Sequence, residues 1–244
     1  MMLGHRQFWE GAQPQMVRFP AESYDRLMCL MPHTHAGVSA TSTAVLLGLP
    51  IITMGDWRRS VVEPVMEAFQ PTMVASFPRT FVELATGELP VAGAAQVHSW
   101  FNTGDSAHYG HIRRLVQPGR RPAGLIKPWL PREAADESAL PGSQFIDGLG
   151  SEMGMANFGH VTTPESPRSD RCVGRPLQYV EAAVLDEERN PGSRRNRRAA
   201  GGQDALAHFG LLEQPAAHRV VRAGRLVADR DVARRDADGK AFTT

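Results

Sequence analysis

This chain repeats one pattern five times: a short apolar run that ends directly in a small polar cluster. The apolar runs have the length and composition of β-strands. They cover residues 26–31, 50–54, 72–75, 97–101 and 143–146. Helical spacing of apolar side chains is found between them, at residues 38–47, 61–69, 80–86 and 109–116. Strands that alternate with helices predict an α/β fold, in which a parallel sheet is flanked by helices.

The polar clusters indicate where a ligand would bind. They occupy residues 33–35, 55–57, 76–79, 102–106 and 148–152, each at the end of a predicted strand. The strands of a parallel sheet all end at the same edge, and ligands of open α/β sheets bind in the crevice outside that edge. We therefore expect the five clusters to line one site.

The pattern changes in the second half of the chain. Residues 178–186 alternate apolar and polar side chains, as a half-buried strand does, and shorter strand-like pieces follow at 219–221 and 225–228. Residues 187–202 have no apolar period and are predicted to form a loop. We expect an α/β subdomain over residues 1–176 and a smaller β-rich, barrel-like subdomain over 177–244, with an irregular loop at 187–210.

Composition narrows the class of protein. With 244 residues the chain can bury a full core. Its apolar runs are far shorter than the roughly 20 residues of a membrane span, and no secretory signal is visible, so we expect no membrane span. The two cysteines, Cys29 and Cys172, are too few for a disulfide framework and favour a cytoplasmic location.

Charge argues against a nucleic-acid partner, because the formal net charge is only +1. Four arginines nevertheless lie close together, at positions 194, 195, 197 and 198. A contact with RNA or phosphate is one interpretation, and a solvated basic loop is the interpretation that we favour.

The sharpest local signal is the glycine-rich stretch at 148–152. Gly148 and Gly150 allow backbone N–H groups to approach an anion closely. Ser151 could then contact a phosphate and Glu152 the Mg²⁺ that accompanies it. The alternative is a glycine-rich turn with a serine N-cap.

A second turn of this kind covers residues 102–106. Its backbone and the carboxylate of Asp105 could hydrogen-bond the edge of a purine. The alternative is helix capping, in which Asp105 or Ser106 opens the helix that follows. The two roles are compatible.

Histidines and catalytic motifs give weaker signals. His33 and His35 would share one face of an extended segment, as in some metal sites, but no Cys or carboxylate stands at ligand spacing near them. Bound zinc is therefore not favoured, and His35 is better explained as a pocket residue. The chain has no Gly-x-Ser-x-Gly elbow, no phosphate-binding Gly-x-x-x-x-Gly-Lys-Ser/Thr, and no Gly-x-Gly-x-x-Gly after the first strand.

Taken in order, several segments resemble the acyl-adenylate-forming (AMP-binding) ligase superfamily, which includes the acyl-CoA synthetases. They are MLGHR at 2–6, PHTHAG at 32–37, NTGDSA at 102–107, DGLGSEMG at 147–154, GRP at 174–176 and RDVARRDADG at 230–239. The third of these resembles the family's adenine-contacting turn, the fourth its D-G-x-G-S-T/S-E stretch, and the fifth its G-x-P turn. The sixth resembles the segment whose first Asp binds ribose.

The resemblance implies a role for each matching residue. Gly104, Asp105 and Ser106 would contact adenine, and His35 would stand at the gate between the acyl pocket and the thiol tunnel. Asp147, Gly148, Leu149 and Gly150 would belong to the nucleotide site. Ser151 would meet the AMP phosphate, Glu152 would hold Mg²⁺, and Asp231 would bind the ribose hydroxyls.

The family's reaction defines the expected partners. A small-molecule carboxylic acid attacks the α-phosphate of Mg·ATP, which gives acyl-AMP and pyrophosphate. The thiol of CoA, or of the phosphopantetheine on an acyl carrier protein, then displaces AMP. ATP or AMP, Mg²⁺ and one of these thiols are therefore the implied cofactors.

The sequence also departs from the family. Neither the family's phosphate loop nor its C-terminal lid domain with the catalytic lysine lies within residues 1–244. The stretch Gly150-Ser151-Glu152 is one residue shorter than G-S-T/S-E, and residues 190–210 are rich in arginine and alanine. We expect a truncated fragment of the large N-terminal domain, impaired or inactive as a ligase. The alternative is a non-catalytic remnant that binds a nucleotide or a partner.

Overall fold

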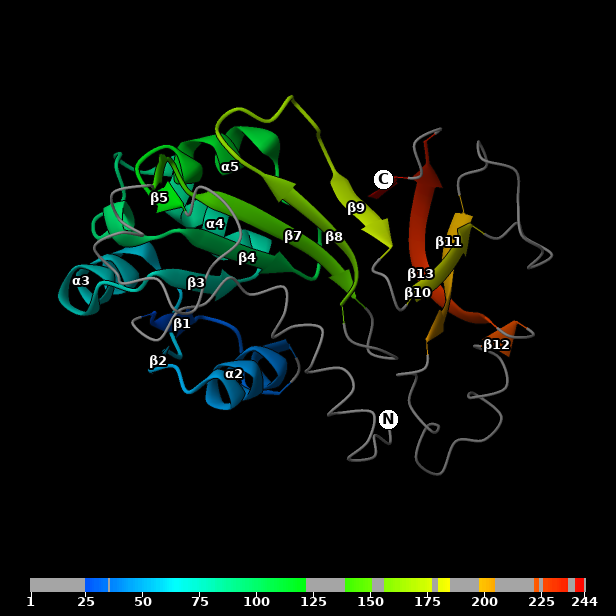
Figure 1. Cartoon of the computed structure of the whole chain (residues 1–244), viewed down its shortest axis with the longest axis horizontal. Helices are drawn as coiled ribbons and strands as arrows, with labels where there is room; N and C mark the ends of the chain where they lie inside the picture. The colour runs from blue at the N-terminus through cyan, green and yellow to red at the C-terminus, as the bar shows by residue number, and fades with distance from the viewer. Residues whose placement is uncertain are drawn as a thin grey trace.

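The structure is a computed structural model. It describes residues 25–34, 36–121, 139–150, 156–176, 180–184, 198–204, 222–223, 226–236 and 240–243. Their centre is a parallel sheet whose strands lie side by side in the order β2, β1, β3, β4, β7 (Figure 1). The strands are β1 (Leu27–Cys29), β2 (Ile51–Thr53), β3 (Met73–Ser76), β4 (Ser99–Thr103) and β7 (Gln144–Gly150). This confirms the predicted parallel sheet.

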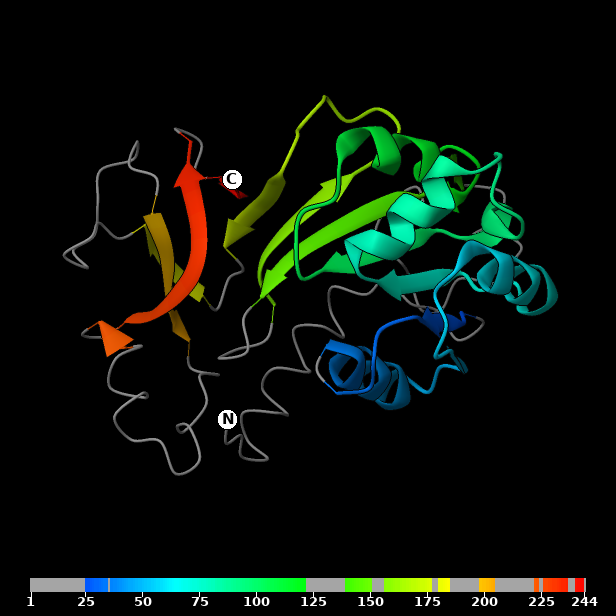
Figure 2. The same cartoon turned by 180° about the vertical axis from the view of Figure 1, so that it is seen from behind.

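The helices cover both faces of this sheet (Figures 1 and 2). One face packs against α2 (Ala36–Leu47), and the other packs against α3 (Arg59–Phe69), α4 (Pro78–Thr86) and α5 (Tyr109–Val116). A short 3₁₀ turn, η1 (Ala94–Gln96), precedes β4. The strand order reverses between β1 and β3, and right-handed crossovers therefore put α2 on the face opposite to the later helices. The four predicted helices are all present.

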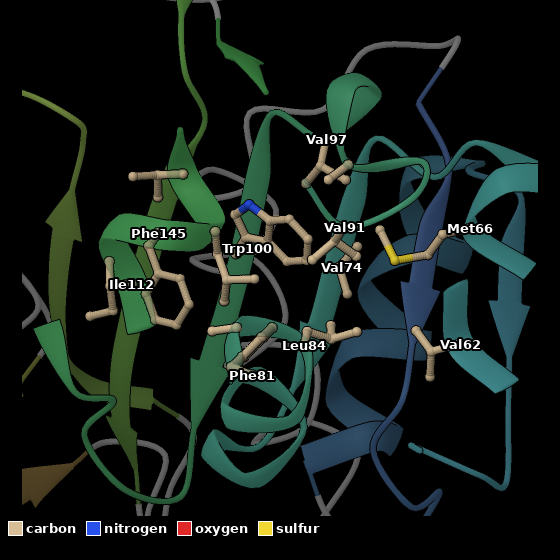
Figure 3. Packing of buried hydrophobic residues seen from close by; sticks show 14 of the residues in the cluster. Val62, Met66, Val74, Phe81, Leu84, Val91, Val97, Trp100, Ile112 and Phe145 are labelled. Carbon is tan, nitrogen blue, oxygen red and sulfur yellow. The ribbon is translucent and has the colours of Figure 1, made fainter. Parts of the chain in front are cut away.

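The larger core lies under α3, α4 and α5, and three aromatic rings form its middle (Figure 3). Phe81 of α4 packs edge-on against Trp100 of β4 and Phe145 of β7, at ring-centroid distances of 6.0 Å and 5.1 Å. All three side chains are buried. The indole N–H of Trp100 donates to Ser143 Oγ at 3.1 Å, so its polar atom is satisfied.

The second core lies under α2. Leu27 and Cys29 of β1 and Met73 of β3 pack there against Ala40 and Ala44 of the helix. Because successive side chains of a strand point to opposite faces, β1 and β3 supply both cores and are buried throughout. This double burial explains why these strands are continuous apolar runs in the sequence.

Antiparallel strands extend the same sheet beyond β7. They follow in the order β8 (Ala156–Thr162), β9 (Cys172–Pro176), β14 (Ala241–Thr243), β13 (Leu226–Arg235), β11 (Arg198–Asp204) and β10 (Val180–Val184). Strand β12 (Arg222–Ala223) pairs with β13, and β5 (Arg120–Arg121) with β6 (Leu140–Pro141) forms a separate small ladder. The main ladder is continuous from β9 to β14, across the predicted boundary at residue 176. The division into two subdomains stays a prediction.

Three local predictions are corrected by the structure. Residues 198–204 were expected in a loop but form β11, which pairs with β10 and β13. This stretch has no apolar period, so only pairing with strands distant in sequence makes it a strand. Residues 102–103 and 148–150, expected in polar turns, continue β4 and β7. Residues 174–176, expected in a turn, belong to β9, where Gly174 has φ +90° and any Cβ would collide with the carbonyl oxygen of Gly159.

The remaining strand predictions divide into two groups. Residues 180–184 and 226–228 are strands, as expected, in β10 and β13. The predicted piece at 219–221 lies outside the described residues. None of the helices in the described part of the chain has the length and apolar character needed to cross a bilayer.

Candidate functional site

Polar side chains stand in a row across the strands near the carboxyl edge of the sheet. Ser76 of β3 is in register with Asn102 of β4, which is in register with Asp147 of β7. The row ends at His160 of β8, which is opposite Asp147. Ser76, Asn102 and Asp147 are each less than 5 % exposed. The row therefore places buried polar side chains next to the apolar core, near the carboxyl edge of the sheet.

Asn102 connects two of the predicted motifs. Its side-chain Nδ2 donates to Asp147 Oδ1 at 2.6 Å and to the backbone carbonyl oxygen of Asp105 at 2.7 Å. The backbone N–H of Ala107 also donates to Asp147 Oδ1, at 3.4 Å. The turn after β4 is thus attached to β7 by side-chain hydrogen bonds. Asn102 was placed in a polar turn from the sequence, and its role as the link was not foreseen.

The turn at 104–106 presents a carboxylate to solvent. Gly104 has φ +93°, and a Cβ on it would lie 3.1 Å from the ring of Phe77, so this position favours glycine. The Asp105 side chain is 59 % exposed, and its Oδ1 accepts the N–H of Ser106 at 2.7 Å. Arg171 Nη2 lies 4.0 Å from the same oxygen.

Helix α5 takes its N-cap residue from the position after this turn region, and not from Asp105 or Ser106 as predicted. The N-cap of α5 is His108, whose side chain makes no capping hydrogen bond. The predicted caps, Asp105 and Ser106, precede it by three and two residues. The exposed carboxylate of Asp105 is therefore free of a helix-capping role.

Burial dominates the electrostatics under the turn. Loss of water raises the pKa of Asp147 to about 6, although hydrogen bonds from Asn102 and Ala107 favour its charged form. Burial also lowers the pKa of His160, and the neighbouring Asp147 opposes that shift. The Asp147 carboxyl is a structural group in the protein interior, whereas the Asp105 carboxylate faces water.

The predicted nucleotide stretch continues β7 up to an irregularity. Gly148 pairs with Thr103 of β4 on one side and with Gly159 of β8 on the other. The register shifts between Leu149 and Gly150, as in a β-bulge, a feature that often lies next to active sites. The Leu149 side chain is buried in a small core with Phe158, Val173 and Ala241. Leu149 thus contributes to packing.

Sequence reasoning missed a contact at the other end of this edge. The guanidinium of Arg79, at the start of α4, lies 4.2 Å from the centroid of the Trp57 ring, in the loop after β2. Trp57 follows β2 and Arg79 follows β3, and these two strands flank β1 in the sheet. The strand order reverses there, and open α/β sheets bind ligands at such a position. Both residues stand in predicted polar clusters, but no sequence signal pairs them, because 22 positions separate them along the chain.

Four of the predicted site residues have no described side chain. His35, Ser151 and Glu152 lie outside the described residues. Asp231 lies on β13. The register between β13 and β11 shifts beside it, since Ala199 pairs with Val232 whereas Gly201 pairs with Ala228. The convergence of Asp105, Glu152 and Asp231 on one hollow therefore stays a prediction.

The histidines of the described residues contact other side chains and do not form a cluster of metal ligands. Within the described ranges no three His, Cys, Asp or Glu side chains gather closely enough to hold a metal ion. His33 Nδ1 instead contacts Thr41 Oγ1 at 3.3 Å, and the rings of His108 and His111 pack edge-on at 6.0 Å.

Known structures share this architecture over nearly the whole chain. O-succinylbenzoate coenzyme A synthetase from Bacillus subtilis, in complex with AMP, matches with a TM-score of 0.75 and 13% identity, over 99% of this chain and 45% of that one. A putative long-chain-fatty-acid CoA ligase from Rhodopseudomonas palustris matches with a TM-score of 0.76 and 15% identity, over 99% and 55%. The chain has the fold of the large domain of acyl-adenylate-forming enzymes. An amide bond synthetase from Marinactinospora thermotolerans shares this adenylate-forming fold, with a TM-score of 0.74 and 16% identity over 98% of this chain and 44% of that one.

A curated relative has higher sequence identity. A 3-aminoavenalumate diazotase from a Streptomyces species is 35% identical over 183 residues, which cover 74% of this chain and 32% of the diazotase. No family model matches the sequence. The chain thus spans about a third of the curated relative and about half of the solved adenylate-forming enzymes, whose large domain its fold matches.

Proposed function

We propose that this chain forms the nucleotide- and acyl-binding part of an ATP-dependent acid ligase, which activates a carboxylate as acyl-AMP for transfer to a thiol. One observation carries the proposal. The exposed Asp105 carboxylate stands on a turn attached by buried hydrogen bonds to β7, at the carboxyl edge of an adenylate-forming fold. A turn of this kind offers backbone groups and a carboxylate to a purine without first having to be ordered.

The proposed roles follow the edge of the sheet. Gly104, Asp105 and Ser106 would contact adenine, and the backbone at 148–150 would lie along the nucleotide. Asp231 would bind the ribose hydroxyls. Ser151 would contact the α-phosphate, and Glu152 would hold the Mg²⁺, which supplies charge neutralisation when bound. His35 would border the acyl pocket.

Formation of acyl-AMP depends mainly on the positioning of the reactants and on neutralisation of charge at the phosphates. A substrate carboxylate that is held in line with the α-phosphate reacts without the entropic cost of a bimolecular encounter. Preorganised donors around the phosphate stabilise the charge that develops as pyrophosphate leaves. The acyl side of the site would include Ala75 and Phe77, at the end of β3, which suits a hydrophobic or aromatic acid. The thiol would come from CoA or from a carrier protein.

Calorimetry with AMP tests the nucleotide site. We expect the chain to bind AMP, and Asp105→Ala and Asp231→Ala to weaken binding about tenfold or more, because each removes a proposed hydrogen-bond acceptor. Asp170→Ala is the matched control, since Asp170 is an exposed surface carboxylate paired with Arg168. If AMP gives no heat with the unaltered chain, the nucleotide-binding proposal is wrong.

Pyrophosphate exchange separates catalysis from binding. A carboxylate-dependent exchange between ATP and labelled pyrophosphate reports acyl-AMP formation directly. We expect weak or no exchange from residues 1–244 alone, because the groups that the family uses around pyrophosphate are not among them. Exchange at rates typical of the full-length family enzymes would contradict this expectation. AMP binding without any exchange would favour a non-catalytic nucleotide-binding role.

A second candidate function comes from the curated relative. Its 35% identity over 183 residues exceeds that of the structural matches, and its name describes a diazotase. We therefore also consider diazotisation of an aromatic amine. Incubation of the chain with 3-aminoavenalumate, nitrite and ATP, followed by mass spectrometry of the diazonium product, distinguishes this activity from carboxylate activation.

A further inference from the structure

A buried side-chain amide links the two proposed nucleotide-binding segments. Asn102 and Asp147 are 45 residues apart in sequence, and their side chains meet at 2.6 Å across β4 and β7. A side-chain amide has two N–H donors. The Asn102 amide donates both to Asp147 and to the carbonyl oxygen of Asp105. The Asn102 side chain therefore attaches the turn at 104–106 to β7, next to the longer contact from the N–H of Ala107 to Asp147 at 3.4 Å.

Neither side chain is available to a ligand. Asn102 is 4% exposed and Asp147 is 2% exposed. Burial of a carboxyl is costly unless hydrogen bonds compensate for the lost water, and here Asn102 and the N–H of Ala107 provide them. Apolar residues would pack between these strands at lower cost, as Trp100 and Phe145 do two positions earlier. A polar pair at this place is best explained by the conformation that it specifies.

We infer that Asn102 and Asp147 are positioning residues that lock the turn at 104–106 to β7, so that Asp105 and the backbone at 148–150 meet the nucleotide in a fixed relative position. The identity of the ligand in this inference rests on the proposed function, whereas the link between the turn and β7 rests on the hydrogen bonds alone. It also changes the expected role of Asp147, from a group that contacts the cofactor to one that acts through Asn102 and the turn.

The other charged groups around the pair do not replace this link. His160 faces Asp147 from β8, Lys240 acts on His160 from the residue before β14, and Asp105 acts on Asp147 from the turn. These groups act on the pair through their charges, whereas Asn102 donates the hydrogen bonds that join the turn to β7. Loss of the Asn102 amide should therefore loosen the turn while the sheet persists, because the contact that remains, from the N–H of Ala107 to Asp147 Oδ1, is long at 3.4 Å.

The same two strands offer a matched control. Gln144 of β7 is in register with Ser99 of β4, and its Nε2 donates to Ser99 Oγ at 2.8 Å. This pair joins β4 and β7 at their amino ends, away from the site. Gln144→Met removes that cross-strand hydrogen bond with little change of volume.

Amide hydrogen exchange on the ligand-free chain tests the geometry. We expect Asn102→Ala to speed exchange at the amides of Ser106 and Ala107 by at least about tenfold, because fixing one residue's backbone corresponds to about that factor or more. Gln144→Met should leave these two amides unchanged. Asn102→Ser is the second variant if Asn102→Ala does not fold, since a serine hydroxyl fills more of the site but cannot donate to both partners.

AMP affinity tests the functional half. We expect Asn102→Ala and Asp147→Ala to weaken AMP binding about tenfold, while Asp147→Asn, which keeps an acceptor at Oδ1, weakens it less than Asp147→Ala. Gln144→Met should bind AMP as the unaltered chain does, even where its thermal stability falls by a similar amount.

The possible results separate the two proposals. Unchanged exchange at Ser106 and Ala107 in Asn102→Ala, or equal acceleration in Gln144→Met, overturns the positioning role. Faster exchange at these amides with unaltered AMP affinity also overturns it, because the turn would then not matter to the ligand. If the unaltered chain binds no AMP, the proposed function fails, and the exchange result still decides whether the pair holds the turn.

Discussion

Asp147 and Asp105 show how burial divides the work between two carboxyl groups in one site. Asp147 is enclosed under the turn, and loss of water raises its pKa to about 6. Asp105 lies just above it, with most of its side chain in solvent. The first residue is suited to holding structure and the second to meeting a ligand, although both are the same amino acid.

The raised pKa of Asp147 predicts a pH-dependent stability. Between its ordinary pKa near 3.8 and its folded pKa of about 6, the folded chain holds the proton more tightly than the unfolded chain. The contribution of Asp147 to stability is therefore fully present below about pH 4 and falls as pH rises through 6. Since Asp147→Asn does not titrate, its free energy of unfolding relative to the unaltered chain should increase over that range.

Urea unfolding at about pH 4 and about pH 7 measures this difference. The lowered pKa of His160 acts in the opposite direction in both proteins, so the comparison between variant and unaltered chain isolates Asp147. A constant difference between the two proteins at both pH values would contradict the prediction. His160→Gln provides a control for the coupling between the two side chains.

Two glycines give a paired prediction at the same scale. Gly104→Ala should destabilise the chain by about 1–2 kcal/mol, because φ is +93° and the ring of Phe77 lies close. Gly110→Ala should stabilise it by about 0.5–1 kcal/mol, because Gly110 lies in α5 with open space around its Cα. Thermal or urea unfolding of both variants checks the signs. A stabilising Gly104→Ala would show that the turn has another conformation.

At the scale of elements, the helices behind the sheet hold the edge in place. The loops that precede α4 and α5 contain Phe77 and the turn at 104–106, and both helices are anchored in the same core. Phe81 provides much of this anchoring, because it contacts the rings on both β4 and β7. Packing of Phe81 therefore helps to fix the positions of β4 and β7, the strands that lead into the candidate site.

Truncation of Phe81 should be costly. We expect Phe81→Ala to destabilise the chain by about 3–5 kcal/mol, since it removes a buried ring and leaves a cavity between α4 and two strands. Phe69→Ala is the control, because Phe69 at the end of α3 is 56 % exposed and should cost about 0.5 kcal/mol or less. Equal losses in urea unfolding would show that Phe81 is not part of a close-packed core.

For the whole molecule, the decisive feature is how many residues pair between neighbouring strands at each place in the sheet. Strands β3 and β4 pair over four residues and lie between two cores. Strands β8 and β9 share only two pairs, as do β9 and β14. The strands from β9 onward are therefore attached to the rest of the sheet over fewer paired residues than β8, which pairs with β7 over six.

Amide hydrogen exchange along the whole chain should reveal this difference. We expect amides of β3 and β4 to exchange slowest, by global unfolding, and amides of β14 to exchange faster by local opening. Bound AMP should slow β14 if Asp231 on the neighbouring β13 contacts the nucleotide. Equal protection of β4 and β14 in the free chain would contradict the expected order.

The sequence alone predicted the parallel part of the fold because its signals are local. A strand buried on both faces, such as β3, is an apolar run whatever it packs against, and a helix such as α3 repeats its apolar side chains with its own period. The common edge of the strands followed from the alternation. Gly104 and Asp105 could be chosen as site residues for the same reason, since a turn after a strand is visible in a few letters.

Contacts between distant segments were decided only by the tertiary structure. The strand β11 exists because β10 and β13 lie on either side of it, although its own residues favour no strand. Asn102 became the link between two motifs because parallel pairing put it beside Asp147, and Leu149 became a core residue because β8 and β9 cover it. A local sequence pattern reflects the secondary-structure propensity and the burial of one element. The register between two strands depends instead on the free energy of pairing between segments that are far apart in the chain.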